Sequence, residues 1–264
     1  MMAIKMNDFA LLQSLLKFNV DLNQADKEGN SCLLHAINND LNEVALFLIS
    51  KNEVDINKSN ELNGTTPLMA AAKKNSIVIC SAIYNRKNID VYAKDDEGIL
   101  YILLFYNSAF LVAVMFNSFE VVKSLIQNFQ IDLNEKNDDI FKKFILWNFF
   151  FFFFYETALF IASSKGYINI VQFLLNFQMT DINASNGNNV TPLMIACFHN
   201  EEEIVRLLCQ DERINVDLLD ILFFVSLMTM FLFFFVYKNT AMIIAASNGY
   251  NSIVQLIAEL KLRI

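Results

Sequence analysis

The sequence predicts an all-α repeat solenoid of helix-turn-helix units separated by β-turn fingers. Three observations support this prediction. A block of residues that starts a short helix recurs along the 264-residue chain, a turn residue follows each copy, and an apolar second helix follows each turn. Such a period is typical of repeat architectures, in which each unit buries its apolar face against its neighbours.

The clearest copy of the block spans residues 191–208. Thr191 can accept a hydrogen bond from a free amide at the helix start, and Pro192 occupies the first helical position, where no amide hydrogen is needed. Asn200 can adopt the left-handed conformation that ends a helix. The glutamates at 201–203 then open a second helix, where the helix dipole favours negative charge. The copy therefore predicts two short antiparallel helices joined by a tight turn.

The same pattern occurs six times in register. The helix-starting residues are Ser31, Thr66, Ser108, Thr157, Thr191 and Thr240. The small residues that let another helix approach are Ala36, Ala71, Ala113, Ala162, Ala196 and Ala245. The turn residues, all of types that tolerate a left-handed backbone, are Asp40, Asn75, Asn117, Gly166, Asn200 and Gly249.

A short Asp-x-Asn signature separates the units. It stands at 21–23, 55–57, 132–134 and 181–183, as Asp-Val-Tyr at 90–92, and in weaker form at 215–217. Asp and Asn at these positions can bond neighbouring backbone and hold a turn. Residues 8–16 look like a second helix without a first, so we expect the array to start with a half unit.

The period, the Thr-Pro-Leu-x-x-Ala block and the Asp-x-Asn spacer resemble the ankyrin repeat family. The resemblance implies one ankyrin repeat domain over residues 1–264. Its expected parts are a half repeat at 1–19 and repeats at about 20–54, 55–89, 90–130, 131–179, 180–213 and 214–264. The family's usual His after Thr-Pro-Leu is absent, since these positions hold Leu34, Met69, Leu111, Phe160, Met194 and Ile243. We expect this change to remove a side-chain hydrogen bond from each repeat.

The distances between successive helix starts are uneven. From Ser31 they are 35, 42, 49, 34 and 49 residues, so three units exceed a 34-residue period by 8, 15 and 15 residues. We assign the excess to insertions at about 99–106, 140–154 and 222–236, each between a spacer and a first helix. These ranges hold 15 of the 26 phenylalanines and Trp147, the only tryptophan. An exposed turn should be polar, so these segments need an explanation.

Three explanations are open. The apolar stretches 99–116, 140–154 and 221–237 approach the length of a membrane span, although Lys142 and Lys143 lie in the second. The segments can instead be apolar loops that grip a partner. We favour retained introns translated in frame. This hypothesis explains the common placement, the T- and A-rich codons of the residues and the restoration of the 34-residue period. The functional protein would then have about 226 residues, which is 264 minus 38.

Charge and reactive side chains exclude several function classes. The net charge of −8 disfavours a nucleic-acid partner. The four cysteines form no Cys-x-x-Cys pair and all fall within predicted helix pairs, which predicts core residues in a reducing setting. His35 and His199 have no nucleophile pattern beside them, and we expect both to be surface residues. We therefore predict no catalytic residues, no cofactor and no metal site.

The resemblance implies a non-enzymatic, intracellular scaffold for protein–protein interaction, most simply cytoplasmic, that binds another protein. The alternative is a membrane-associated ankyrin protein anchored by the apolar segments. Ankyrin arrays usually bind with their finger tips and the exposed face of their first helices. Carried onto this sequence, those positions include Lys27, Glu28, Asn30, His35, Asn38, Glu61, Asn63, Lys73, Lys94, Asp96, Asn188 and Asn189.

Overall fold

The computed structural model describes residues 2–6, 8–15, 17–18, 20–95, 105–139, 155–218, 222–223, 236–237 and 240–261. The protein divides into two compact units. The first consists of Met1–Ile131 with Asp138–Phe144, and the second of Asp132–Asn137 with Ile145–Ile264. Most of the three predicted insertions, and Asp96 among the predicted contact residues, lie outside the described residues.

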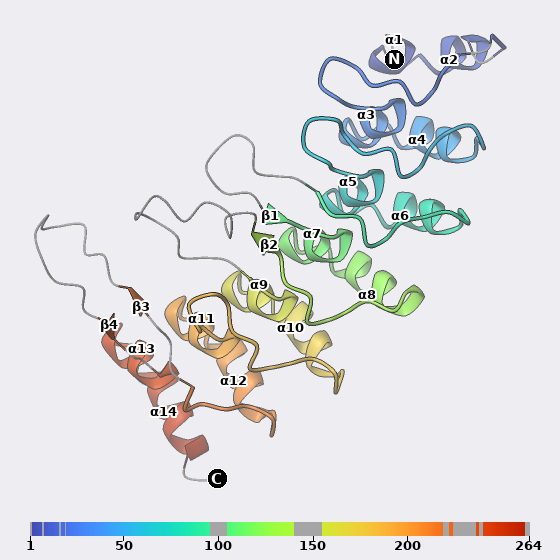
Figure 1. Ribbon diagram of the computed structural model, residues 1–264. Helices are drawn as coiled ribbons and strands as arrows, with labels where there is room; N and C mark the ends of the chain where they lie inside the picture. The colour runs from blue at the N-terminus through green and yellow to red at the C-terminus, as the bar shows by residue number, and fades with distance from the viewer. Residues whose placement is uncertain are drawn as a thin grey trace, which may run out of the picture. The chain divides into compact units, whose positions relative to one another are not determined.

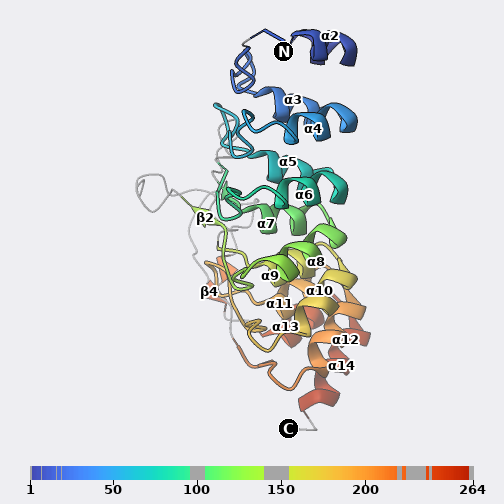
Figure 2. The ribbon, with the colours of Figure 1, turned by 90° about the vertical axis from the view of Figure 1, so that its right-hand side faces the viewer.

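The first unit is built from paired helices. They are α1 (Met2–Lys5), α2 (Phe9–Leu15), α3 (Cys32–Asn38), α4 (Asn42–Ile49), α5 (Pro67–Lys73), α6 (Ile77–Tyr84), α7 (Ala109–Met115) and α8 (Phe119–Asn128). The first helices α3, α5 and α7 pack side by side, and so do the second helices α4, α6 and α8 (Figures 1 and 2). Strand β1 (Phe105–Tyr106) pairs antiparallel with β2 (Asp138–Asp139), with Phe105 opposite Asp139.

The second unit repeats this plan. Its helices are α9 (Ala158–Ser164), α10 (Ile168–Leu175), α11 (Pro192–Phe198), α12 (Glu202–Gln210), α13 (Ala241–Ser247) and α14 (Asn251–Lys261). Helix α11 packs between α9 and α13, and α12 packs between α10 and α14. Strands β3 (Leu222–Phe223) and β4 (Val236–Tyr237) form a second antiparallel pair. The predicted helical solenoid is confirmed, while the two-residue strand pairs were not predicted.

The helix starts and turns follow the sequence pattern. Each first helix begins after a predicted Ser or Thr, whose hydroxyl accepts a hydrogen bond from the amide three residues later, at 3.3–3.4 Å. The six predicted turn residues all have positive φ, between 51° and 77°. The first helices are short, so these caps and turns set where they begin and end.

In two repeats a methionine at the position of the missing histidine makes a hydrogen bond to the backbone. The sulfur of Met69 accepts from the amide of Thr66 at 3.4 Å, and the sulfur of Met194 accepts from the amide of Thr191 at 3.5 Å. Thioether sulfur is a weak acceptor. The expected loss of a hydrogen bond in every repeat is therefore wrong for these two units.

The spacer asparagines connect neighbouring repeats. In the first unit, Asn23 donates to the carbonyl of Glu53 at 2.8 Å and accepts from the amide of Asp55 at 2.8 Å. Asn57 bonds Asn88 and Asp90 in the same way. In the second unit, Asn134 bonds Met179 and Asp181 in this way. Asn183 likewise bonds Arg213 and Asn215. The spacer Asp holds the local turn as predicted, but the Asn works across the repeat junction.

One further expectation needs correction, and the structure also bears on the membrane alternative. The N-terminal half unit contains α1 as well as α2, and Ala3 and Ile4 of α1 are buried with the helix against α3. The described part of the apolar stretch 99–116 includes α7, whose first six residues are buried in the first unit. None of the helices in the described ranges is both long and apolar enough to cross a membrane. Segment 140–154 and most of 221–237 lie outside those ranges.

Candidate protein-binding surface

The base of two short fingers, at 26–30 and 186–190, is closed by one residue that bonds another at two points, whereas in the finger at 60–65 the amide of Thr65 donates to the side chain of Asn63 instead of Asn60. In the first finger, the amide of Asp26 donates to the carbonyl of Asn30 at 2.9 Å, and its carboxylate accepts from the amide of Asn30 at 3.0 Å. Asn186 and Val190 form the same pair of bonds, both at 3.0 Å, in the second unit. We call this arrangement the base clasp. In these two fingers its partners are four residues apart.

The same clasp closes two much longer fingers. Asp95 clasps Asn107, with bonds of 3.1 and 2.8 Å, across twelve residues of sequence. Asn137 clasps Glu156, with bonds of 3.2 and 2.8 Å, across nineteen. These spans exceed four by 8 and 15 residues, which equals the surplus expected from the spacing of the helix starts. The surplus residues therefore fall, in sequence, between the two clasped residues, and these four clasps keep one geometry.

The first two fingers lie against each other. The side-chain nitrogen Nδ2 of Asn60 donates to the carbonyl of Glu28 and to the side-chain oxygen of Asn30, both at 2.9 Å. The amide of Glu61 donates to the carbonyl of Gly29 at 3.0 Å. Gly29 has a φ of 76°, and a Cβ there would meet Asn60 and Glu61 at 3.0–3.1 Å. Only glycine fits both the backbone and the close approach, so the two finger tips form one joined edge.

The predicted contact residues of the first unit differ in exposure. Those that are exposed are Lys27, Glu28, Asn38, Glu61, Lys73 and Lys94, whereas Asn63 is half-buried. The joined edge brings Lys27, Glu28, Glu61 and Asn63 together, because their fingers are bonded to each other. Their role in binding a partner stays a prediction.

Asn30 and His35 are not free surface residues. Asn30 is 9% exposed, and its oxygen already accepts from Asn60 and, at 3.4 Å, from Asn38. The ring nitrogen Nδ1 of His35 lies 3.7 Å from a carboxylate oxygen of Asp26, with both side chains largely buried. The expectation that His35 is a surface histidine is wrong. Both residues support the first finger from inside.

An exposed aromatic residue was missed by the sequence prediction. Phe116 follows α7 and is 43% exposed, with the Lys73 ammonium 4.9 Å from its ring centroid. Other repeats carry Asn, Lys or His at this position, which is eight residues after the helix start. The apolar residue at a polar position was the available signal. Phe116 and Lys73 together give the first-helix face a cation–π pair.

In the second unit the predicted residues are Asn188 and Asn189. The amide of Asn188 donates to the side chain of Asn186 at 2.9 Å, and Asn189 has a φ of 60° at the finger tip. Asn188 is half-buried and Asn189 is exposed. Phe198, at the end of α11, is 53% exposed and lies edge-on to the His199 ring at 5.2 Å. Phe198 was also missed by the prediction.

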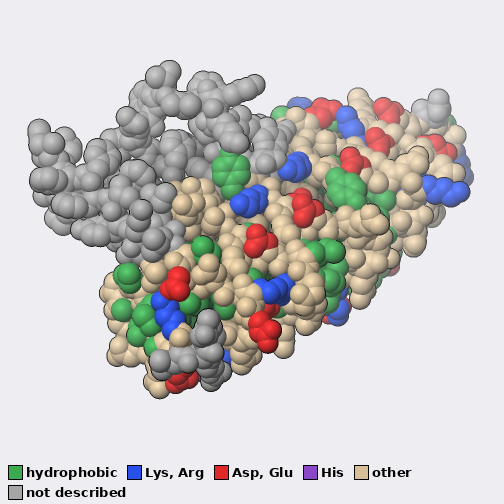
Figure 3. All heavy atoms as spheres, turned by 60° about the horizontal axis from the view of Figure 1, so that its bottom comes forward, with side chains coloured by type: hydrophobic (Ala, Val, Ile, Leu, Met, Phe, Trp, Pro, Cys, Tyr) green, Lys and Arg blue, Asp and Glu red, His purple; other side chains and the backbone are tan. Residues whose placement is uncertain are grey.

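Charge is finely mixed on the described surface. On the face drawn in Figure 3, Lys and Arg side chains lie next to Asp and Glu side chains, with hydrophobic side chains between them. Two carboxyl groups among the described residues depart from ordinary behaviour: burial raises the pKa of Glu156 to about 7 against an opposing effect of Lys165, and hydrogen bonding to Arg213 lowers the pKa of Asp211. Glu156 stands in the base clasp of a long finger.

The comparisons with known proteins agree with this geometry. A family model for ankyrin repeats in three copies matches residues 1–95 and 110–220. The chain belongs to the ankyrin repeat family. Members of this family are typically non-enzymatic modules for protein–protein interaction, and the repeat domain here has the finger edge and first-helix face of such modules.

Similar proteins show the fold rather than the partner. The ankyrin repeat domain of Bcl-3, of the IkappaB protein family, aligns with a TM-score of 0.69 at 16% identity, covering 97% of this chain and 96% of that one. An ankyrin repeat domain from Acinetobacter baumannii aligns with a TM-score of 0.62 at 21% identity, covering 87% and 97%. Alpha-latrocrustotoxin-Lt1a of Latrodectus tredecimguttatus is 26% identical over 155 residues, which are 58% of this chain but only 9% of the toxin.

Proposed function

We propose that this ankyrin repeat protein is a non-enzymatic scaffold that binds another protein through its finger edge and first-helix face. The observation that carries the proposal is the joined edge of the first two fingers, where Asn60 bonds Glu28 and Asn30. A surface held by backbone and amide bonds loses little conformational entropy when a partner docks. Exposed Lys27, Glu28 and Glu61 supply charge, and Phe116 supplies apolar area on the same unit.

Photo-crosslinking tests where the partner binds. A photoreactive phenylalanine analogue replaces Glu28, Asn63 or Lys73 in turn, and Ser81 or Gln127 as controls. The controls are exposed residues on the second helices α6 and α8 of the same unit. We expect one partner protein to be captured from the three test positions and not from the controls. Capture from the second-helix positions alone would contradict the proposed surface.

We further propose an intracellular location. The support is that all four cysteines are free thiols and three of them are buried. Burial raises the pKa of Cys80 and of Cys197 to about 12, so both thiols remain protonated and unreactive at neutral pH. Cell fractionation tests this proposal, and recovery only in detergent-extracted membranes would favour the membrane-anchored alternative instead.

The retained-intron hypothesis concerns the same binding module. The clasp closes over three intervening residues in one finger and over eighteen in another. This supports a repeat array that folds without the additional residues. Sequencing of the mature transcript tests the hypothesis directly. We expect transcripts that lack the segments encoding about 99–106, 140–154 and 222–236, and a mature transcript that always contains all three would contradict it.

A further inference from the structure

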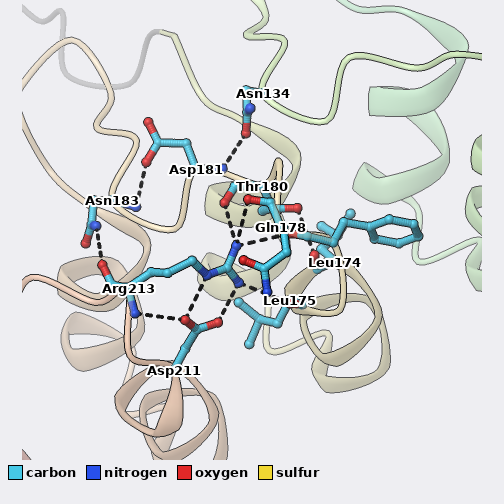
Figure 4. A network of polar contacts seen from close by, with 10 residues as sticks. Asn134, Leu174, Leu175, Gln178, Thr180, Asp181, Asn183, Asp211 and Arg213 are labelled. Carbon is cyan, nitrogen blue, oxygen red and sulfur yellow. Dashed lines mark hydrogen bonds and ion pairs between the residues drawn. The ribbon is translucent and has the colours of Figure 1, made fainter.

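Two arginines perform the same structural task, one in each unit. Arg213 follows α12 and donates from Nη1 to the carbonyls of Phe177 and Thr180, both at 3.1 Å, and from Nη2 to Leu175 at 3.1 Å (Figure 4). These carbonyls lie at and after the end of α10, where a helix leaves acceptors unsatisfied. Arg213 therefore binds the end of the preceding second helix.

Arg86 makes the equivalent contacts in the first unit. It follows α6 and donates from Nη1 to the carbonyls of Ile49 and Lys51, and from Nη2 to Val54 at 3.3 Å. These carbonyls stand at and after the end of α4, as those bound by Arg213 stand at and after the end of α10. Both guanidinium groups bind the carbonyl at the helix end and the carbonyls two and five residues after it, but the donors of the first and last bonds are exchanged: Nη2 and Nη1 in Arg213, and Nη1 and Nη2 in Arg86.

The two arginines differ on their other edge. In the second unit, Asp211 accepts from Nε of Arg213 at 2.8 Å and from Nη2, which is a two-point ion pair (Figure 4). Asp211 is the C-cap residue of α12, two residues before Arg213, whereas the C-cap of α6 is the uncharged Asn85, one residue before Arg86. Within the described residues, Nε of Arg86 has no partner and no carboxylate pairs with its guanidinium.

Arg86 also lines a pocket of about 570 Å³. One wall is the loop 52–57 after α4, and the other is the loop 85–88 after α6. In Figure 1 these loops lie at the ends of the second helices, on the side of the first unit away from its short finger loops. The pocket is large enough to receive a side chain with part of its backbone.

The neighbouring residue Tyr84 does not fill this role. Its ring lies edge-on to Phe129 at 5.2 Å, and its hydroxyl lies beside Cys80 and Ser124. Burial raises the pKa of the Tyr84 hydroxyl, so it remains neutral. Tyr84 therefore points into the helix layer and supplies no negative charge to Arg86.

We propose that the Arg86 pocket binds a carboxylate, held at two points by Nε and Nη2 as Asp211 is held by Arg213. A planar carboxylate matches the fork of a guanidinium. A doubly charged phosphate suits the pocket less well, because Glu53 and Asp55 also line it, their repulsion grows with the charge of the bound anion, and only Lys87 adds a second positive charge. This site is separate from the finger edge, so the inference does not rest on the proposed function.

The amide side chains in the pocket walls favour a polypeptide as the source of the carboxylate. Asn52, Asn85 and Asn88 are exposed residues of the two loops, and each amide group can both donate and accept. Peptide backbone has the complementary donors and acceptors. An acidic side chain or the C-terminus of a polypeptide would therefore gain contacts that a free small carboxylate lacks.

Nuclear magnetic resonance of the arginine Nε–H group tests the proposal on the full-length protein. The probes are sodium acetate and the blocked peptide acetyl-Gly-Asp-Gly-amide, added up to about 100 mM carboxylate at constant ionic strength with chloride as reference. We expect both probes to shift the Arg86 Nε–H signal and to leave that of Arg213 in place. An Arg86 signal that responds to the carboxylates no more than to chloride would overturn the proposal.

Two matched variants sharpen this test. Asn85→Asp places a carboxylate in the protein itself at nearly unchanged size, and we expect it to reduce the shift of Arg86 at least fivefold. Asp211→Asn removes the internal carboxylate of the second unit, and we expect the Arg213 signal to become responsive. A response at Arg86 that survives Asn85→Asp unchanged would contradict two-point binding at this edge.

The two probes also separate the sources of the carboxylate. A dissociation constant for the peptide at least about tenfold lower than that for acetate would identify a polypeptide partner. Equal constants for both would identify a free small carboxylic acid as the ligand of the same site.

Discussion

Two short and two long fingers of this protein have the same base. Asn186 clasps Val190 over three intervening residues, and Asn137 clasps Glu156 over eighteen, with hydrogen bonds of 2.8–3.2 Å in both. The entropy cost of closing a loop grows only logarithmically with its length, so the longer finger costs about 1.4 kcal/mol more. The comparison shows that the base, rather than the finger length, preserves the helix register of the array.

The largest expected effect comes from removing the clasp itself. In the long finger Asn137→Ala leaves the half-buried amide of Glu156 without its acceptor, and in the short finger Asn186→Ala does the same to Val190. We expect each change to lower the free energy of unfolding by about 2 kcal/mol. Urea unfolding of both variants measures this. A loss at Asn186 with none at Asn137 would show that the long finger is not held by its clasp.

Deleting residues 140–154 should have an intermediate and opposite effect. The loop closed by Asn137 and Glu156 would shrink to the length of the short finger, and we expect the free energy of unfolding to rise by about 1.4 kcal/mol. As a matched control, fifteen Gly and Ser residues inserted between Asn188 and Asn189 should lower it by a similar amount. Thermal unfolding monitored by circular dichroism compares the two, and a deletion that destabilises the protein would refute the loop-closure explanation.

The smallest expected effect concerns pH. Burial raises the folded-state pKa of Glu156 from 4.5 to about 7, so the folded protein favours the protonated carboxyl group. This contribution to stability is fully present below about pH 4.5 and is lost as the pH rises through about 7. Val190, at the same place in the short finger, cannot titrate.

Glu156→Gln should remove this pH dependence. We expect the variant to be more stable than the wild type at pH 8, by about 1 kcal/mol, and close to it at pH 4.5. Urea midpoints measured across this pH range test the expectation. An unchanged pH profile in the variant would show that Glu156 does not titrate in the folded state.

Much of the fold could be predicted because its determinants are local. Ser or Thr at each helix start and Asp, Asn or Gly at each turn act within a few residues of their own position, and the structure confirms all of them. The spacer Asn57 was expected to act locally as well. Its bonds to Asn88 and Asp90 depend on the register of the next repeat, which the sequence pattern alone does not reveal.

The candidate surface could be predicted only in part. Positions such as Lys27 and Glu61 follow from the repeat pattern and are exposed. The burial of Asn30 could not be predicted, because it results from contacts with the second finger thirty residues away. The pairing of His35 with Asp26 likewise depends on how the finger folds back over the first helix.

Hydrogen exchange at the clasp amides tests most directly whether one clasp closes fingers of every length. The amides of Asn107 and Glu156 close the long fingers, and those of Asn30 and Val190 close two short ones. We expect comparable protection factors for all four amides in the full-length protein. Exchange of Asn107 and Glu156 at the rate of an unstructured peptide, with Asn30 and Val190 protected, would contradict a common clasp.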